Sequence, residues 1–187
     1  MKLQLKKEIL KKRSKLPADE AAKKSRRIKK KLLALPIFKK AKSILFYVSF
    51  KNEVDTYEMI KSAFGKKDVI VPITNKKNNS LIISKLKCLD DLCCGCFGIP
   101  EPRKSKIKRF NKKNLDLVIV PGVVFDRGCN RIGFGHGYYD KFLRGLSTKT
   151  KTIGLAYDFQ IVDKLKAEKH DIPVDIIITE KMTIKRI

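Results

Sequence analysis

The residues best suited to chemistry lie between Arg131 and Asp140, in the segment Arg-Ile-Gly-Phe-Gly-His-Gly-Tyr-Tyr-Asp. Three glycines at alternate positions, Gly133, Gly135 and Gly137, stand between a cation and a carboxylate. Because glycine has no Cβ, backbone N–H groups there can converge on an anion, and a helix beginning near Gly137 would add its positive end. The spacing suits a phosphate group, although an ordinary tight turn has the same pattern.

The segment lacks the two common nucleotide-binding fingerprints. No Gly-Lys-Ser/Thr ending follows the glycines, and no Gly-x-Gly-x-x-Gly opens a βαβ unit. Asp140 stands near an expected helix start, where an acidic side chain is favourable against the helix dipole. The alternative for Asp140 is a ligand of the Mg²⁺ that accompanies a nucleoside triphosphate.

Apolar runs predict the sheet that would position this segment. Runs rich in β-branched residues predict six strands, at 44–48, 69–71, 81–83, 117–120, 153–156 and 176–178. Helical patterns cover 2–15, 17–35, 56–64, 138–146 and 160–166. The alternation predicts an α/β fold, a three-layer α/β/α sandwich with a largely parallel central sheet and basic helices at the N-terminus. The run 117–120 stops at Pro121-Gly122, so the glycine segment follows a strand end, where sites of α/β proteins gather.

Length and composition favour a single globular domain over residues 1–187. The chain has 187 residues, of which 43% are hydrophobic, enough for one sizeable core. No apolar run approaches the roughly 20 residues that a membrane helix requires, and no secretory apolar region follows the basic N-terminus. We expect a monomeric, cytoplasmic protein.

The net charge of +25 is large for this length. Such a charge suits nucleic acid, an anionic membrane surface or small anions. The lysines are spread along the whole chain with few aromatics among them, and no nucleic-acid-binding fingerprint is present. A solvated, lysine-rich surface is the simpler interpretation, so we expect no specific nucleic-acid partner and no membrane partner. A polynucleotide-binding protein remains the alternative that the charge alone would explain.

Four of the five cysteines crowd into nine residues, Cys88, Cys93, Cys94 and Cys96, while Cys129 precedes the glycine segment. A zinc site would need a second well-spaced pair or neighbouring histidines, and neither is present. We expect reduced, partly buried thiols in a loop.

A longer series of landmarks closely resembles the signature of 5-formyltetrahydrofolate cyclo-ligases, also called methenyltetrahydrofolate synthetases. The signature is carried by Pro121-Gly122, Phe125-Asp126, Gly128, Arg131, Gly133, Gly135 and residues 137–140. Further landmarks follow the family's order at 2–6, 53–56, 98–102, 160–162, 170–171, 174–175 and 179–180. The resemblance covers nearly the full length and implies a fold like those of sugar-phosphate isomerases and CoA transferases.

The resemblance also implies an activity and a set of site residues. The family uses ATP and Mg²⁺ to cyclise 5-formyltetrahydrofolate to the 5,10-methenyl form. ATP would contact Lys2, Leu3, Gln4, Leu5, Lys6, Arg131, Ile132, Gly133, Phe134, Gly135, His136, Gly137, Tyr138 and Tyr139. The reduced folate would contact Val48, Phe50, Glu53, Phe134, Gly135, His136, Gly137 and Tyr138. Arg131 and Tyr138 would be catalytic, and Asp140 with Asp175 would hold Mg²⁺.

Several of these positions have structural alternatives. Glu53 suits the amino-pyrimidinone of a pterin but also a helix cap, and Phe50 suits an ordinary core. Asp171 is a further candidate near the metal, and either Asp171 or Asp175 would also suit the turn before a strand. Lys6 stands where the family prefers arginine, so the charge is kept and the bidentate fork is lost. His170 is expected to be structural.

A related enzyme acting on sugar phosphates or CoA esters is the remaining alternative. It would explain the glycine segment but would need a base elsewhere and no ATP. The scattered landmarks favour the cyclo-ligase.

Overall fold

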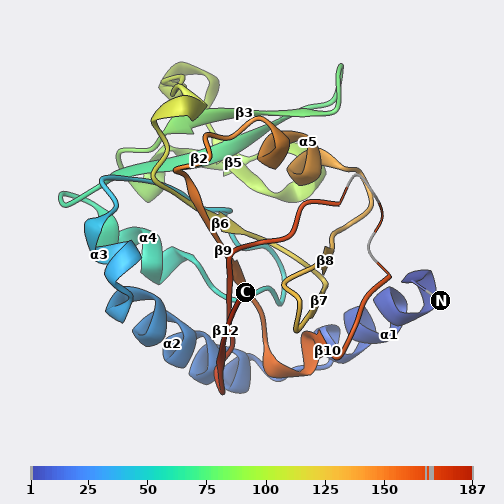
Figure 1. Cartoon of the computed structure of the whole chain (residues 1–187). Helices are drawn as coiled ribbons and strands as arrows, with labels where there is room; N and C mark the ends of the chain where they lie inside the picture. Colours follow the sequence, from blue (N-terminus) through green and yellow to red (C-terminus); the bar gives the residue numbers. More distant parts are fainter. Residues whose placement is uncertain (1, 167, 169–170, 187) are drawn as a thin grey trace.

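A seven-stranded sheet forms the centre of the computed structural model, which describes residues 2–166, 168 and 171–186 (Figure 1). The order is β12 (Thr183–Lys185), β11 (Ile176–Ile178), β9 (Lys151–Leu155), β6 (Leu117–Val120), β1 (Ser43–Leu45), β2 (Asp68–Asn75) and β3 (Ser80–Lys85). The five inner strands run parallel, and only the edge strands β12 and β3 are antiparallel to their neighbours. The predicted α/β class with a largely parallel sheet is confirmed.

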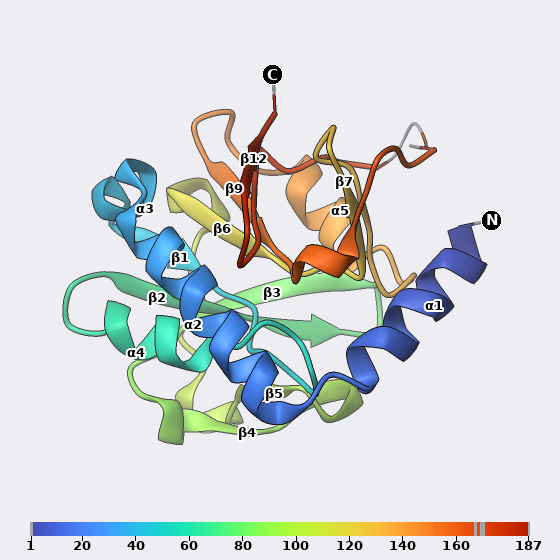
Figure 2. The ribbon, with the colours of Figure 1, turned by 90° about the horizontal axis from the view of Figure 1, so that it is seen from below.

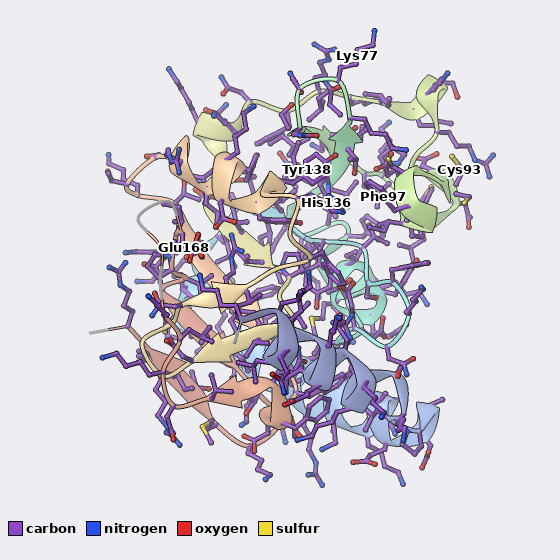
Figure 3. The ribbon with its side chains drawn as sticks, turned by 90° about the vertical axis from the view of Figure 1, so that its right-hand side faces the viewer. Lys77, Cys93, Phe97, His136, Tyr138 and Glu168 are labelled. Atoms are coloured by element: carbon purple, nitrogen blue, oxygen red, sulfur yellow. The ribbon has the colours of Figure 1, made fainter. Side chains whose placement is uncertain are left out.

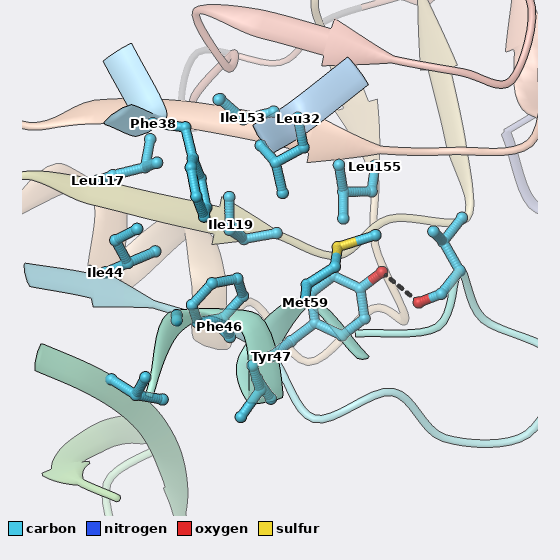
Figure 4. Close-up of a cluster of buried hydrophobic side chains, with 14 of the residues drawn as sticks. Leu32, Phe38, Ile44, Phe46, Tyr47, Met59, Leu117, Ile119, Ile153 and Leu155 are labelled. Carbon is cyan, nitrogen blue, oxygen red and sulfur yellow. Dashed lines mark hydrogen bonds between the residues drawn. The ribbon is translucent and has the colours of Figure 1, made fainter. Parts of the chain in front are cut away.

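Side chains of the central strands alternate between two buried clusters, one on each face of the sheet. In β6, Leu117 and Ile119 join the cluster under the helices α2 (Ala18–Ala34), α3 (Pro36–Lys40) and α4 (Tyr57–Ala63), shown in Figure 4. Val118 and Val120 join the cluster under α5 (Tyr138–Arg144) on the opposite face. Because strand side chains alternate with period two, continuous apolar strands require a cover on both faces, and the result is the predicted three-layer sandwich.

The N-terminal helix α1 (Lys2–Ser14) packs on a smaller sheet and not on the central one (Figure 2). This sheet has the order β10 (Ile161–Val162), β7 (Val124–Asp126) and β8 (Arg131–Ile132). Leu5, Ile9 and Leu10 of α1 contact its cluster around Val123 and Val124. The apolar edge of the basic helix is therefore buried, and the helix runs beside the segment that begins at Arg131.

A third, two-stranded unit lies at the other side of the glycine segment. The strands β4 (Leu92–Cys94) and β5 (Pro100–Pro102) pair antiparallel around a turn in which Phe97 adopts a left-handed conformation, with φ of 59°. Cys88, Cys93 and Cys94 are exposed there and unpaired, and the described residues hold no group of three or more His, Cys, Asp or Glu suited to a metal. Cys129 is buried, and burial raises the pKa of its thiol to about 11.

One predicted helix is wrong. Residues 160–166 are not a helix, because a 3₁₀ turn at Asp158–Gln160 (η5) is followed by β10. The side chain of Gln160 explains the difference, since it hydrogen-bonds the backbone of Tyr157 and of Gly122 and Val123, which fixes a turn. The helix predicted over 17–35 is confirmed, because α2 ends at Ala34 with an extended Leu35 before Pro36. Pro36 then opens the separate helix α3 at a position where its missing N–H costs nothing. The edge strand β12 was not predicted.

Within the described part of the chain, no helix is long and apolar enough to cross a bilayer. The single domain, the monomeric state, the cytoplasmic location and the lack of a nucleic-acid partner stay predictions. His170 lies outside the described residues.

Candidate active site

A cavity of about 630 Å³ opens where the strands β1 and β6 end. Tyr47, Val48, Phe50 and Glu53 reach it from the segment after β1, and Pro121 reaches it from the end of β6. The other walls come from α1, the β2–β3 hairpin, the β4–β5 unit, the segment 131–140 and Asp171. This cavity lies at the sheet edge where the sequence predicted the site.

The glycine segment bends through conformations that favour glycine. Gly135 has φ of 104° and Gly137, the residue before α5, has φ of 69°. Lys6 of α1 donates a hydrogen bond from Nζ to the carbonyl of Phe134, and a Cβ added to Gly135 would lie 3.3 Å from the same Nζ. The glycines therefore allow both the bend and the close approach of α1.

Arg131 and Asp140 form an ion pair at the wall of the cavity. The guanidinium Nη2 lies 2.9 Å from Oδ1 of Asp140, and the two side chains are 2% and 22% exposed. The same Oδ1 accepts a longer hydrogen bond from the N–H of Ile172, at 3.3 Å. Asp171 also lines the cavity, where it pairs with Lys2 at 3.2 Å. We call Lys2, Arg131, Asp140 and Asp171 the Arg131 cluster.

Two buried donors at this wall have no partner among the described residues, Nε of Arg131 and the hydroxyl of Tyr139. Burial lowers the pKa of the Arg131 guanidinium, while the nearby carboxylates of Asp140 and Asp171 oppose that effect. Burial also raises the pKa of Tyr139, so the phenol keeps its proton. Because buried donors are normally hydrogen-bonded, both groups indicate that a ligand oxygen completes the site.

Glu53 is a half-buried residue whose carboxylate is held by its own loop. Oε2 accepts a hydrogen bond from the N–H of Phe50 at 3.0 Å, and the carbonyl of Glu53 accepts one from the hydroxyl of Tyr157 at 3.0 Å. The hydroxyl of Tyr47 fixes the next residue by donating to the carbonyl of Val54 at 2.9 Å. Burial raises the pKa of Glu53, and the positive charge of Arg13 opposes the rise. The carboxylate is thus fixed in place before any ligand binds.

Phe97 and His136 line the cavity and stack on each other. Their rings stack with centroids 5.3 Å apart and planes 14° apart, and Tyr138 tilts against His136 at 6.0 Å (Figure 3). The stack joins the β4–β5 unit to the glycine segment. It gives the cavity an aromatic wall suited to a flat ring system.

Comparison with known proteins identifies the family. The model of the 5-formyltetrahydrofolate cyclo-ligase family matches residues 1–180. The chain belongs to the 5-formyltetrahydrofolate cyclo-ligase family. It is therefore an enzyme of the ligase class.

Relatives and solved structures agree over almost the whole chain. The 5-formyltetrahydrofolate cyclo-ligase of Haemophilus influenzae is 32% identical over 94% of this chain and 96% of its own. A 5,10-methenyltetrahydrofolate synthetase of Aquifex aeolicus superposes with a TM-score of 0.86 at 35% identity, covering 98% of this chain and 92% of that one. The synthetase of Mycoplasma pneumoniae superposes with a TM-score of 0.76 at 29% identity, covering 96% and 98%. These matches support the predicted cyclo-ligase fold.

Most site residues expected from the cyclo-ligase resemblance lie together at the cavity. They are Lys2, Leu3, Lys6, Val48, Phe50, Glu53, Arg131, Ile132, Gly133, Phe134, Gly135, His136, Gly137, Tyr138, Tyr139 and Asp140. Two positions expected to contact ATP do not line it. Gln4 is exposed, and Leu5 packs on the small sheet.

Asp175 lies away from the cavity, so its expected role beside Asp140 is corrected by the geometry. It precedes β11, and its Oδ2 accepts hydrogen bonds from the N–H and Oγ1 of Thr152 near the start of β9, at 2.8 and 2.9 Å. The parallel strands β9 and β11 begin at the edge of the sheet opposite to the cavity. Asp175 is a strand-start residue, and Asp171 is the aspartate that joins Asp140.

Sequence reasoning missed several lining residues. Lys51, Pro72, Thr74, Leu81 and Phe97 line the cavity without having been singled out, and Arg13 lines it although the sequence alone favours a solvated helix face there. For Arg13 a signal existed, because it follows Lys6 by seven residues and so falls on the same face of α1. Nothing in the sequence around Phe97 indicated that its ring would meet His136.

Proposed function

We propose that the protein uses ATP and Mg²⁺ to convert 5-formyltetrahydrofolate to 5,10-methenyltetrahydrofolate, releasing ADP and phosphate. The observation that carries the proposal is that one cavity joins a cationic glycine segment with unpaired buried donors to a fixed, half-buried carboxylate, that of Glu53. The first suits a polyphosphate, and the second suits the amino-pyrimidinone of a pterin. Family membership supports the same reaction.

The chemistry needs a leaving group that the substrate lacks. The formyl oxygen on N5 attacks the γ-phosphorus of ATP, its bond to phosphorus forms, and the bond to ADP breaks. N10 then attacks the activated carbon, phosphate leaves with the former formyl oxygen, and N10 gives up its proton. A formyl oxygen leaves poorly, whereas its phosphate leaves readily, and this difference is the reason for ATP. No protein nucleophile is required.

The protein would contribute alignment and charge neutralisation. Lys2 and Lys6 reach the cavity from α1, and Arg131 offers its unpaired Nε–H to a phosphoryl or formyl oxygen. Donors fixed before the reaction stabilise developing charge without reorganising, which accounts for much of the effect of such sites. Tyr138, beside His136, would flank the folate.

The residues around Asp140 fit Mg²⁺. This ion prefers hard oxygen ligands and keeps several waters, so one or two carboxylates suffice alongside phosphate oxygens. No described residue hydrogen-bonds Oδ2 of Asp140, and Asp171 lies beside it at the same wall. Mg²⁺ held there would neutralise the phosphate oxygens and make ADP a better leaving group.

The test is the appearance of methenyltetrahydrofolate absorbance when the protein is mixed with 5-formyltetrahydrofolate, ATP and Mg²⁺. Omission of any one component should abolish the signal. Asp140→Asn should lower turnover by about 10²-fold or more, on the scale of lost electrostatic stabilisation in other active sites. Asp163→Asn is the matched control, because the Asp163 side chain is 99% exposed and, among the described residues, forms an ion pair only with Arg127, at 3.5 Å. A folded protein that binds ATP and gives no absorbance would contradict the proposal.

A further inference from the structure

Arg13 is a buried cation whose hydrogen-bonding groups are unused. The residue is 6% exposed in the last turn of α1 and lines the cavity. Across the part of the chain that the structure describes, its guanidinium makes no hydrogen bond or ion pair, although it carries five N–H donors. The guanidinium nitrogens are not among the fully buried atoms without a partner in the described residues, so they face the cavity, where a ligand can supply an acceptor.

The surroundings hold this guanidinium in a fixed position. Its Cζ lies 5.4 Å from the centre of the Phe134 ring, a cation–π contact that leaves donors free at the edge of the guanidinium plane. The carbonyl of Arg13 accepts a hydrogen bond from Nδ2 of Asn52 at 2.9 Å. Asn52 directly precedes Glu53, so the end of α1 is tied to the loop that carries the half-buried carboxylate.

Phe134 separates Arg13 from the cations proposed to bind ATP. Its carbonyl accepts from Lys6 while its ring faces Arg13. Lys6 and Arg13 are seven residues apart, about 10 Å along a helix at 1.5 Å per residue. The positive charge of Arg13 instead acts on Glu53, where it opposes the rise in pKa that burial causes. No ion pair joins these two described residues, so the carboxylate and the guanidinium both remain available to one ligand.

An edge with adjacent donors and an acceptor would satisfy both groups. The pterin of 5-formyltetrahydrofolate has such an edge, with the 2-amino group and N3–H as donors beside the 4-oxo acceptor. Building on the proposed function, we propose that Arg13 donates to the 4-oxo oxygen while Glu53 accepts from N3–H and the 2-amino group. Arg13 is then a specificity-determining residue that, together with Glu53, distinguishes 4-oxo pterins from 4-amino pterins. A 4-amino group would place a donor against a cation that has only donors.

The test compares three ligands by titration calorimetry, with wild-type protein, Arg13→Met and Arg13→Lys. The ligands are 5-formyltetrahydrofolate, its 4-amino counterpart and 5-formyltetrahydropteroate, which lacks the glutamate. Loss of a charge-assisted hydrogen bond should weaken binding of the 4-oxo ligands to Arg13→Met by about 10- to 100-fold. The 4-amino ligand should change little, so the ratio of the two affinities should fall by the same factor, while the part that Glu53 contributes through N3–H remains. Arg13→Lys keeps the charge but not the fork, and should lose part of the 4-oxo affinity even if the methionine variant folds poorly.

The pH dependence gives a second readout that a purely structural role would not move. Removal of the Arg13 charge should raise the pKa of Glu53 further, so the acidic limit of folate binding should shift to higher pH. An unchanged acidic limit would contradict the pairing.

Other outcomes would overturn the assignment in distinguishable ways. Equal losses for the 4-oxo and 4-amino ligands would make Arg13 structural. A loss that disappears for 5-formyltetrahydropteroate would mean that Arg13 binds a glutamate carboxylate, and a parallel loss of ATP affinity would mean that it binds phosphate. Wild-type protein that forms no methenyl product would refute the proposed function, whereas normal turnover with unchanged ligand preference in both variants would refute only the role of Arg13.

Discussion

Replacement of Gln160 with glutamate should destabilise the protein in a pH-dependent manner. Gln160 is 1% exposed, and both ends of its amide are used. Nε2 donates to the carbonyls of Gly122 at 3.2 Å and Val123 at 2.8 Å, while Oε1 accepts from the N–H of Tyr157 at 2.8 Å. The substitution keeps the shape of the side chain and the hydrogen bond accepted from Tyr157. It replaces the NH₂ group, which donates to two carbonyls, with a carboxylate oxygen that cannot donate.

The expected loss of unfolding free energy is large because no cation takes part in these contacts. Leaving a buried charge without a partner costs about 3–5 kcal/mol of unfolding free energy. Protonation of the introduced carboxyl restores one donor, so its pKa is raised in the folded state. The variant therefore keeps this stability below the pKa of the introduced carboxyl in the unfolded chain, about 4.3. It loses the stability as pH rises through the higher pKa of the same carboxyl in the folded state.

Urea denaturation of the variant and of wild type between pH 5 and pH 8 measures this difference. Gln160→Met is the control, because it removes the same hydrogen bonds without adding charge; its loss, about 1–3 kcal/mol for each group left unpaired, should not depend on pH. The reasoning would be refuted if the glutamate variant matched the methionine variant at every pH. That result would mean that water reaches the carboxyl.

Four further substitutions test the assignment of the site residues. Glu53→Gln should raise the unfolding free energy at neutral pH and weaken folate binding. Burial raises the pKa of Glu53, so its negative charge opposes folding above that pKa. The stability gained by the variant, measured by urea denaturation, should therefore disappear near pH 4 and below. Asp171→Asn should raise the Mg²⁺ concentration needed for turnover, whereas Asp175→Asn should lower the melting temperature without that effect; the reverse pattern would restore Asp175 to the metal site. Phe97→Ala should raise KM for the folate by about 2- to 10-fold, the value of one aromatic contact, and leave KM for ATP unchanged; equal changes in both would place Phe97 outside the folate contact.

Much of the central sheet could be predicted from the sequence because each of these strands is a local apolar run. Runs such as 117–120 are apolar at every position, which only a strand covered on both faces tolerates in an α/β protein. The wrong helix at 160–166 shows where local patterns fail. The turn there depends on hydrogen bonds from Gln160 to residues 37 and 38 positions earlier, which no local window contains. The edge strand β12 is short and half exposed, so its pattern is weak.

The candidate site divides in the same way between local and distant information. The glycine segment was found because its residues act on one another, as Arg131 does on Asp140 nine positions later. Asp175 was misplaced because its side of the sheet depends on whether it precedes or follows a strand. Phe97 was missed because its role depends on the β4–β5 unit meeting His136. Spacing predicts which residues can do chemistry; topology decides which of them meet.

The hydroxyl of Tyr139 links the two halves of the proposed reaction. Tyr139 lines the same cavity as Glu53 and the Arg131 cluster, and the charges of Glu53 and Arg131 act on its pKa in opposite directions. The proposed transfer requires the formyl oxygen to meet the γ-phosphorus between those two sites. An unpaired buried O–H and the unpaired Nε–H of Arg131 are the donors at that boundary. Both would find an acceptor only when a substrate oxygen is present, so the binding energy of these two bonds becomes available where charge develops.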